Sequence, residues 1–263
     1  MSDNAVTLEV VGGLARVTLS RPRARNAWDD TLGEGMTEVF SEVAGRRDVR
    51  CVVLMGEGPV FCAGADLVAG FPTLPDGRDD LRTTLRRRFH PGFLAMLDVP
   101  QPIVAAVHGP AIGAGACLAL ASDIVVMARE TYLQFRFAKI GLMPDVGATA
   151  LLATCVGPSK AAELLMLADP IDAAECDRLG LVSRVVDADS VVEESLALGR
   201  RLAEGPTQAY ATTKKALRTW SWRGLAEQIE LEAGLQQTLI GTSDWAEGRA
   251  SFLERREPRF TGR

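Results

Sequence analysis

Hydrophobic residues along the chain alternate between strand-like and helix-like patterns. Thr7 to Val11 and Ala15 to Leu19 are short runs on either side of two adjacent glycines, which predicts a β-hairpin. Segments 49–55 and 103–107 are almost continuously apolar, as is typical of strands buried on both faces. Segment 29–43 has its large apolar residues at helical spacing. This alternation predicts an α/β fold with parallel strand pairing.

The second half of the chain is predicted to be mostly helical. The expected elements are short helices from Ala148, Ser159 and Asp172, a last short strand over 181–186, and helices from Val191 onward with a break at Gly205-Pro206. We therefore expect a core of residues 1–195 that contains the functional site, followed by a helical C-terminal region of residues 196–263.

Composition and charge argue against several classes of protein. The 263 residues are 47% hydrophobic and carry a net charge of −5, which does not favour a nucleic-acid partner. No uninterrupted apolar run reaches the roughly 18 residues of a membrane span, so we expect no membrane segment. Met1 to Asn4 are polar or acidic apart from the initiator, so we expect no signal peptide.

Cysteine and histidine usage indicates a reducing compartment. The five cysteines are odd in number and scattered, no CxxC pair occurs, and the chain has two histidines. A disulfide framework and a metal site are therefore not expected. The cytoplasm is the expected location.

Two glycine- and alanine-rich loops carry the strongest functional signal. Residues 61–67 read FCAGADL and residues 108–115 read HGPAIGAG, and each loop follows a buried strand and leads toward a helix. Small residues allow a ligand to approach the backbone closely, and free N–H groups at a helix start favour negative charge. Two such loops that converge on one point would form an oxyanion hole.

These loops resemble those of the enoyl-CoA hydratase/isomerase (crotonase) family, and the resemblance extends over nearly the whole chain. The other matching segments are Arg21-Pro22 with Asn26-Ala27, the run from Gly141 to Asp145, Gly180-Leu181-Val182, and the run from Phe252 to Arg256. The resemblance implies a right-handed spiral of ββα units with a helical C-terminal region that builds homotrimers or dimers of trimers. It also implies an acyl-CoA thioester substrate and no cofactor beyond the CoA moiety of that substrate.

The resemblance further implies roles for individual residues. The backbone N–H groups of Ala65 and Ala114 would hold the thioester oxygen and stabilise an enolate. Arg23 and Arg25 would bind the CoA phosphates, and Arg255 would reach the CoA of a neighbouring subunit. Guanidinium groups suit this task because they offer paired donors to phosphate oxygens. The remaining residues expected beside the CoA ester are Ala63, Asp66, Leu67 and Phe252.

The chain departs from the family where hydratases place two glutamates. By alignment those positions are Cys117 and Phe137, and neither side chain can act as a carboxylate. Asp145 remains as the candidate acid/base, since an aspartate above an apolar pocket should have a raised pKa. The alternative interpretation of Asp145 is an N-cap of the helix that follows. Cys117 is interpreted as an inert core residue rather than as a nucleophile.

His90 follows three arginines in a segment, 81–97, that predicts a basic amphipathic helix interrupted near Pro91. Its spacing matches the histidine base of an aryl-CoA dehalogenase of the family. The alternative is that the whole run 86–90 is a solvated surface patch.

The sequence therefore predicts an enoyl-CoA isomerase in which Asp145 moves a proton between two carbons of the acyl chain. Three alternatives stay open: an enoyl-CoA hydratase with atypical residues, a non-catalytic acyl-CoA binder, and an aryl-CoA hydrolase or dehalogenase that uses His90 with Asp145. A nucleotide-dependent oxidoreductase is disfavoured because neither GxGxxG nor GxxxxGK[ST] occurs.

Overall fold

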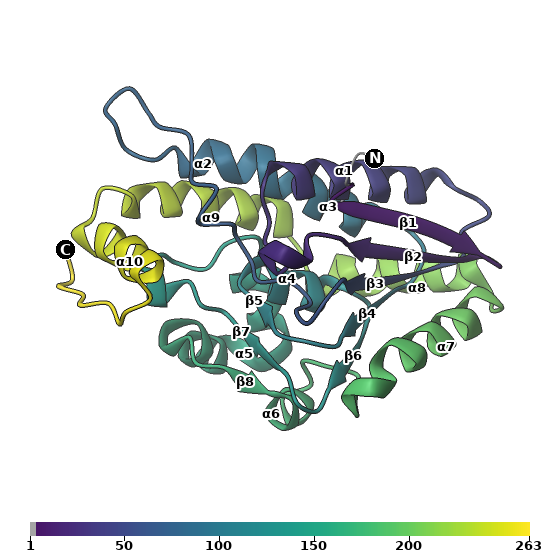
Figure 1. The fold of residues 1–263 in the computed structure, drawn as a ribbon. Coiled ribbons are helices and arrows are strands. Elements are labelled where there is room, and N and C mark those ends of the chain that lie inside the picture. Colours follow the sequence, from purple (N-terminus) through teal and green to yellow (C-terminus); the bar gives the residue numbers. More distant parts are fainter. Residues whose placement is uncertain (1–3) are drawn as a thin grey trace.

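One large mixed sheet forms the centre of the protein. The computed structural model describes residues 4–263 and places six strands in the order β1-β2-β3-β4-β6-β9 (Figure 1). The pair β1–β2 is antiparallel and every other neighbouring pair is parallel. The strands are β1 (Val6–Val11), β2 (Leu14–Leu19), β3 (Cys51–Gly56), β4 (Ile103–Val107), β6 (Ile124–Ala128) and β9 (Arg184–Val186).

Both faces of this sheet are covered. Helix α1 (Asp30–Gly45) packs on one side and α7 (Val191–Ala203) on the other (Figure 1). Strand β3 shows the reason for its unbroken apolar run, because Val52 and Leu54 enter the main core while Val53 and Met55 pack toward α7. Successive side chains of a strand point to opposite faces, so a sheet covered on both faces needs apolar residues at every position.

A second, smaller sheet makes the fold a spiral. It has the order β5-β7-β8, with β5 (Ala111–Ile112) following β4 and β7 (Tyr132–Gln134) following β6, while β8 (Ile171–Asp172) closes the edge. Two successive turns of chain each add one strand to each sheet before a helix begins, which confirms the predicted α/β spiral of ββα units. These turns end in α4 (Ala114–Ala121) and α5 (Ala148–Leu167), and β8 is followed by α6 (Ala173–Arg178).

The helix labelled α5 consists of two helices that are separated by a break in the backbone. Gly157 has φ 76° and ψ 162°, which no helix accommodates, and Pro158 follows it. This agrees with the two short helices predicted from Ala148 and Ser159. The 20-residue length and mean hydropathy of 1.3 would by themselves suit a membrane span, but the break at Gly157 and Pro158 divides this stretch.

Segment 81–97 is helical with an interruption just before Pro91, as predicted, but its basic run is not a surface patch. It contains α2 (Leu81–Thr84), a π-helical turn over Leu85–Phe89 and α3 (His90–Asp98). The interpretation of residues 86–90 as a surface patch is wrong for three of them, because Arg88, Phe89 and His90 are buried. Arg88 is neutralised by Asp30 on α1, with Nε and Oδ1 2.7 Å apart, so its burial leaves no unpaired charge.

The C-terminal helices follow α7 and fold back over the rest of the chain. They are α8 (Thr207–Ser221), α9 (Leu225–Leu239) and α10 (Ser243–Glu254). Helix α9 lies beside α2, and α10 packs on the turn Ala138–Ile140 (Figure 1). That contact is close, because a Cβ on Gly248 would lie 2.3 Å from the Ile140 carbonyl carbon. Side chains of α9 also bond to residues 143–149, so both helices hold the segment 138–149 from outside.

Asn26 connects the loop after β2 to the segment after β3. It is fully buried, and its Nδ2 donates to the carbonyl oxygens of Glu57, Val60 and Phe61 at 2.9, 2.8 and 3.2 Å. Its Oδ1 accepts from the Arg21 N–H at 2.9 Å. A single buried side chain therefore satisfies four backbone groups of two different segments.

We predict that Asn26→Ala lowers the free energy of unfolding by about 3 kcal/mol, because it removes all four hydrogen bonds of a fully buried side chain. Urea unfolding at constant m-value would measure the loss. Ser41→Ala on the exposed side of α1 is the control and should change stability by less than about 0.5 kcal/mol. A loss below about 1 kcal/mol for Asn26→Ala would contradict this role.

Candidate active site

The two glycine-rich loops lie directly against each other. Cys62 N–H donates to the Pro110 carbonyl oxygen at 3.3 Å, and Ile112 N–H donates to the Cys62 carbonyl oxygen at 2.9 Å. A Cβ on Gly64 would lie 2.6 Å from the Ile112 oxygen and 3.5 Å from the Ala114 nitrogen. Gly64 also has φ +82°, so both the space and the backbone conformation require glycine here.

This contact brings Ala65 and Ala114 to one place with their N–H groups available. Around Ala65, the backbone bonds of the bridge to Trp28 use the Gly64 carbonyl and the Asp66 N–H, so the Ala65 N–H points away from Trp28. Ala114 is the first residue of α4 and has no acceptor within the helix. Within residues 4–263 neither N–H donates to another group. The geometry suits a pair of oxyanion donors.

A pocket of about 660 Å³ opens at these two loops. Both candidate donors, Asp145 and nearly all of the expected CoA-binding residues line it: Ala65, Ala114, Asp145, Arg23, Arg25, Ala63, Asp66, Leu67 and Phe252. Arg255 does not line it; this residue ends α10 with φ 55° and is exposed. Segments 23–25, 63–67, 114, 145 and 252 thus meet in one pocket although they are distant in sequence.

Asp145 is the pocket carboxyl with acid/base potential. It is 7% exposed, and burial raises its pKa to about 7, since removing water disfavours the charged form. Gln236 Nε2 donates to its Oδ2 at 2.9 Å and opposes this shift, while the nearby Glu232 carboxyl adds to it. The other pocket carboxyl, Asp66, is paired with Arg21 at 3.2 Å. Among the described lining residues, Asp145 is therefore the carboxyl without a cation partner.

The alternative reading of Asp145 as an N-cap is wrong. The cap residue of α5 is Gly147, and the Glu232 carboxylate reaches across from α9 to take the helix N–H groups. Glu232 Oε2 accepts from Gly147 N–H at 2.7 Å and Oε1 from Thr149 N–H at 3.1 Å. A distant glutamate thus accepts from the N–H groups at the start of α5, and the Asp145 side chain lines the pocket instead.

The backbone immediately after Asp145 is strained. Val146 is fully buried with φ 52°, a left-handed conformation that β-branched residues rarely adopt. Gly147 continues in the same region with φ 79°. Such conformations persist only where the surroundings hold them, and they concentrate at functional sites.

The two positions expected for hydratase glutamates hold no acid/base group. Cys117 is fully buried on α4, where burial raises the pKa of its thiol well above the usual value, so it does not supply a thiolate. Its Sγ lies 3.7 Å from the Asp145 carbonyl oxygen. Phe137 lines the pocket, and its ring comes within 3.8 Å of the Cβ position of Gly113. Phe137 shapes the pocket wall, Cys117 is buried outside the pocket lining, and neither side chain offers an acid/base group.

His90 lies outside the group of residues that line the pocket, although Phe89 beside it is one of them. Burial lowers the pKa of His90 to about 4, so the imidazole is neutral at pH 7. Its Nε2 has no partner in the described part of the chain. This position does not favour His90 as a base working with Asp145.

Sequence reasoning missed an apolar wall and a cation of the pocket. Leu81, Leu85 and Phe89 recur at every fourth position along α2 and the π-helical turn, and all three line the pocket. The sequence shows the spacing of these three residues. It does not show that the helix face they form is turned toward the pocket. Arg136 also lines the pocket, is exposed, and forms no salt bridge with a described carboxylate.

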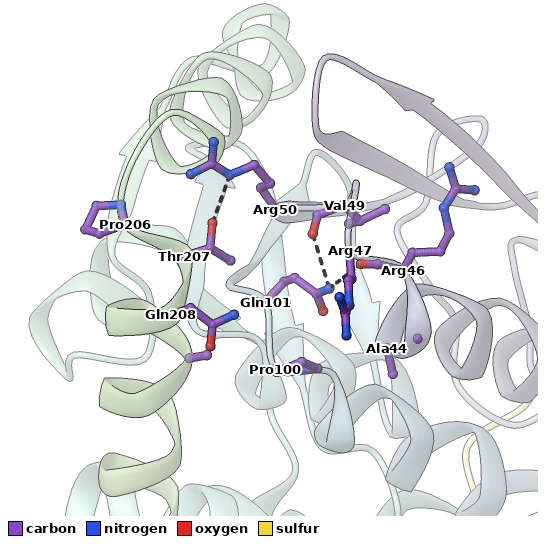
Figure 2. A pocket seen from close by; sticks show the side chains of 12 residues that line it. Ala44, Arg46, Arg47, Val49, Arg50, Pro100, Gln101, Pro206, Thr207 and Gln208 are labelled. Carbon is purple, nitrogen blue, oxygen red and sulfur yellow. Dashed lines mark hydrogen bonds between the residues drawn. The ribbon is translucent and has the colours of Figure 1, made fainter.

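A second hollow, of about 750 Å³, lies between the end of α1 and the start of α8. Figure 2 shows its arginines and the amide of Gln101 among them. Arg46 is paired with Asp48 and Glu42, and Arg50 Nε donates to Thr207 Oγ1 at 3.0 Å. Because Arg46 and Arg50 are already engaged and no carboxyl lines the hollow, it lacks the acid/base group that the first pocket has.

Comparison with known proteins decides the family. The family model described as enoyl-CoA hydratase/isomerase matches residues 9–263. The chain belongs to the enoyl-CoA hydratase/isomerase family. A probable enoyl-CoA hydratase of Rhodobacter capsulatus is 38% identical over the full length of both chains. A 1,2-epoxyphenylacetyl-CoA isomerase of Escherichia coli is 34% identical, covering 95% of this chain and 96% of that protein.

The fold agrees with this assignment. A crystal structure of an enoyl-CoA hydratase from Mycobacterium avium subsp. paratuberculosis superposes with a TM-score of 0.86 at 32% identity, covering 98% of each chain. The predicted crotonase family and fold are therefore confirmed. The protein is a crotonase-family acyl-CoA enzyme, and its relatives are named both as hydratases and as an isomerase.

The burial of Asp145 predicts a dependence of stability on pH. A carboxyl whose pKa rises on folding from 3.8 to about 7 stabilises the folded protein at low pH, and this contribution is lost as the pH rises through 7. Asparagine stays neutral throughout. The unfolding free energy of Asp145→Asn relative to the wild type should therefore increase by about 2 kcal/mol between pH 5 and pH 8.

Chemical denaturation of both proteins at the two pH values measures this difference. Asp48→Asn is the control, because Asp48 is exposed and Arg46 lowers the pKa of its carboxyl. Its contribution does not change between pH 5 and pH 8, so the control should stay level. An equally level result for Asp145→Asn would contradict the raised pKa.

Proposed function

We propose that the protein is an enoyl-CoA isomerase that moves a carbon–carbon double bond through an enolate. The observation that supports this most is which acid/base groups the pocket contains and which it lacks. Among the described lining residues Asp145 is the carboxyl without a cation partner, and Cys117 and Phe137 stand where the resemblance places the glutamates of hydratases. One carboxyl is enough to carry a proton between two carbons, whereas the hydratase mechanism uses two to position and activate water.

In the proposed reaction the carboxyl group of Asp145 acts first as the base and then as the acid, so no proton is gained or lost overall. Ionised Asp145 takes a proton from C2 of a 3-enoyl thioester, and the electron pair delocalises onto the thioester oxygen. The N–H groups of Ala65 and Ala114 stabilise that oxyanion. Protonated Asp145 then returns the proton to C4, which leaves the double bond between C2 and C3. With a pKa of about 7, Asp145 is suited to both the basic and the acidic step.

The pocket lining supports an apolar acyl group. Leu81, Leu85 and Phe89 form one wall, with Phe71 and Phe137 nearby in the same pocket. A second candidate substrate class is a ring-bearing acyl group, which these phenylalanines suit because aromatic rings pack well against each other. The relative named as a 1,2-epoxyphenylacetyl-CoA isomerase motivates a test with such esters.

The CoA moiety is proposed to lie against the basic rim of the pocket. Arg23 and Arg25 line this rim, are exposed, and have no carboxylate partner among residues 4–263. Arg136 adds a third cation at the same pocket. Arg255 remains a proposal for the CoA of a neighbouring subunit, since it is exposed but lies outside this pocket. No cofactor beyond CoA is proposed.

We also propose a cytoplasmic homotrimer or dimer of trimers, associated through residues 196–263. Several large apolar side chains in that region are solvent-exposed in the single chain, as expected of surfaces that subunits cover: Leu217, Trp220, Leu231, Leu235, Phe252 and Leu253. A trimer by sedimentation equilibrium would support this arrangement, and a monomer at micromolar concentration would oppose it.

Isomerisation predicts a specific isotope result. Incubated with 3-enoyl-CoA, the protein should give 2-enoyl-CoA without a gain of oxygen from heavy-oxygen water. Asp145→Asn should lose roughly 100-fold or more in kcat and keep acyl-CoA binding, because it removes the proton carrier and not the pocket. Mass spectrometry and calorimetric titration measure the two properties, on straight-chain and phenyl-bearing esters.

Other outcomes separate the alternatives. Oxygen incorporation would indicate a hydratase with atypical residues, and binding without turnover on any ester would indicate a non-catalytic binder. Release of free CoA or halide that His90→Ala abolishes would indicate an aryl-CoA hydrolase or dehalogenase. Full activity of Asp145→Asn would refute the proposed role of this residue.

The oxyanion donors have their own test. Ala114 is the first residue of α4, where proline is tolerated, so Ala114→Pro deletes one N–H and leaves the helix able to form. We expect kcat to fall by about 100- to 1000-fold. Ala114→Gly keeps the N–H and is the matched control, with activity close to the wild type. Equal activity of the two variants would exclude the Ala114 N–H from catalysis.

A further inference from the structure

Helix α9 presents three polar residues at four-residue spacing to the segment that carries Asp145. They are Gln228, Glu232 and Gln236, and the last two are fully buried. A buried polar stripe on a helix is costly unless every group is bonded. Here the partners all belong to residues 143–149, so the stripe holds a single loop.

Gln236 binds the loop at two places, the backbone of Met143 and the carboxyl group of Asp145. Its Nε2 donates to the Met143 carbonyl oxygen at 2.7 Å and to Asp145 Oδ2 at 2.9 Å, and its Oε1 accepts from the Met143 N–H at 3.3 Å. These three bonds also determine which end of the amide is oxygen, because reversing it would place like groups together. The amide therefore points a donor at the reacting carboxyl.

Glu232 holds the other side of Asp145, where the backbone is strained. It accepts from the N–H groups of Gly147 and Thr149 at 2.7 and 3.1 Å and also from Thr149 Oγ1. Val146, with its left-handed φ of 52°, lies between the groups that Gln236 and Glu232 bind. The two side chains, one helical turn apart, thus fix the loop on both sides of its strained residue.

We propose that Gln236 and Glu232 are positioning residues that hold the Asp145 carboxyl and its strained loop for proton transfer. This inference rests on the proposed function of Asp145. It also implies opposite electrostatic effects of the two residues. Gln236 donates to the ionised carboxyl and favours it, whereas the neighbouring negative charge of Glu232 disfavours it.

Few other titratable groups face Asp145 within the described residues. Cys117 on α4 is buried and neutral, because burial raises the pKa of its thiol. The remaining charged groups of the pocket line its wall together with Asp145: Asp66, which is paired with Arg21, and Arg23, Arg25 and Arg136. The two α9 residues are therefore the polar groups whose removal should move the titration of Asp145 most directly.

The experiment compares pH profiles of kcat/KM and a direct titration of Asp145. The acid limb of the wild type is expected near pH 7. Gln236→Met removes the donor, so the limb should move upward by about one pH unit, with kcat about tenfold lower and KM little changed. Glu232→Gln removes the neighbouring charge, so the limb should move downward. A side chain that only supports the fold would not produce shifts of opposite sign.

Direct titration by carboxyl-carbon NMR of the labelled aspartates, with Asp145→Asn for assignment, gives the same pKa without turnover. Gln228→Met is the matched control, because this glutamine bonds to Thr149 Oγ1 at 2.9 Å from the same face and has no bond to Asp145. It should leave the titration of Asp145 unchanged. If Glu232→Gln does not fold, Gln236→Glu replaces the donor with a carboxylate and should raise the titration midpoint beyond that of Gln236→Met.

Unmoved titrations, or shifts of the same sign in Gln236→Met and Glu232→Gln, would overturn the inference even if Asp145 proves essential. The proposed function fails separately, through full activity of Asp145→Asn. In that case the NMR titration still decides whether α9 controls this carboxyl.

Discussion

The rest of the site depends on the close backbone contact between the two glycine-rich loops. Gly64 has no room for a side chain beside the Ile112 carbonyl, and its φ of +82° excludes most other residues. Because the loops touch, the N–H groups of Ala65 and Ala114 share one pocket, and the strands β3 and β4 that precede the loops must be neighbours in the sheet. Asn26 adds to the same constraint by tying the preceding loop to residues 57–61.

Asp145 illustrates how a site can oppose the stability of its fold. Its burial disfavours the charged form, and Val146 next to it has a conformation that costs energy. Both features persist because α9 supplies bonds on each side of them. The C-terminal helices thus support the pocket, to which α10 contributes Phe252. A carboxyl with a pKa of about 7 that lines the same pocket as the Ala65 and Ala114 N–H groups is the arrangement expected for the proposed enolate chemistry.

Much of the fold was predictable because local pattern and tertiary burial agree. The unbroken apolar runs become strands β3 and β4, the helical spacing over 29–43 becomes α1, and Gly157-Pro158 divides α5 as expected. Where prediction failed, distant partners were the reason. Arg88 is buried because Asp30 neutralises it, and Asp145 is not a helix cap because Glu232, 87 positions later, takes that role. No local pattern contains such information.

The sequence alone determined the family, the two loops that need glycine, and the absence of the hydratase carboxyls at Cys117 and Phe137. These conclusions depend only on which residues are present and on their order along the chain, so no spatial information is needed to reach them. Only the tertiary structure decided that Asp145 is buried and unpaired by a cation, that His90 lies outside the pocket lining, and that Gln236 and Glu232 bind the Asp145 loop. Burial and hydrogen bonding between segments about 90 residues apart arise from packing, which brings together groups that the chain order keeps separate.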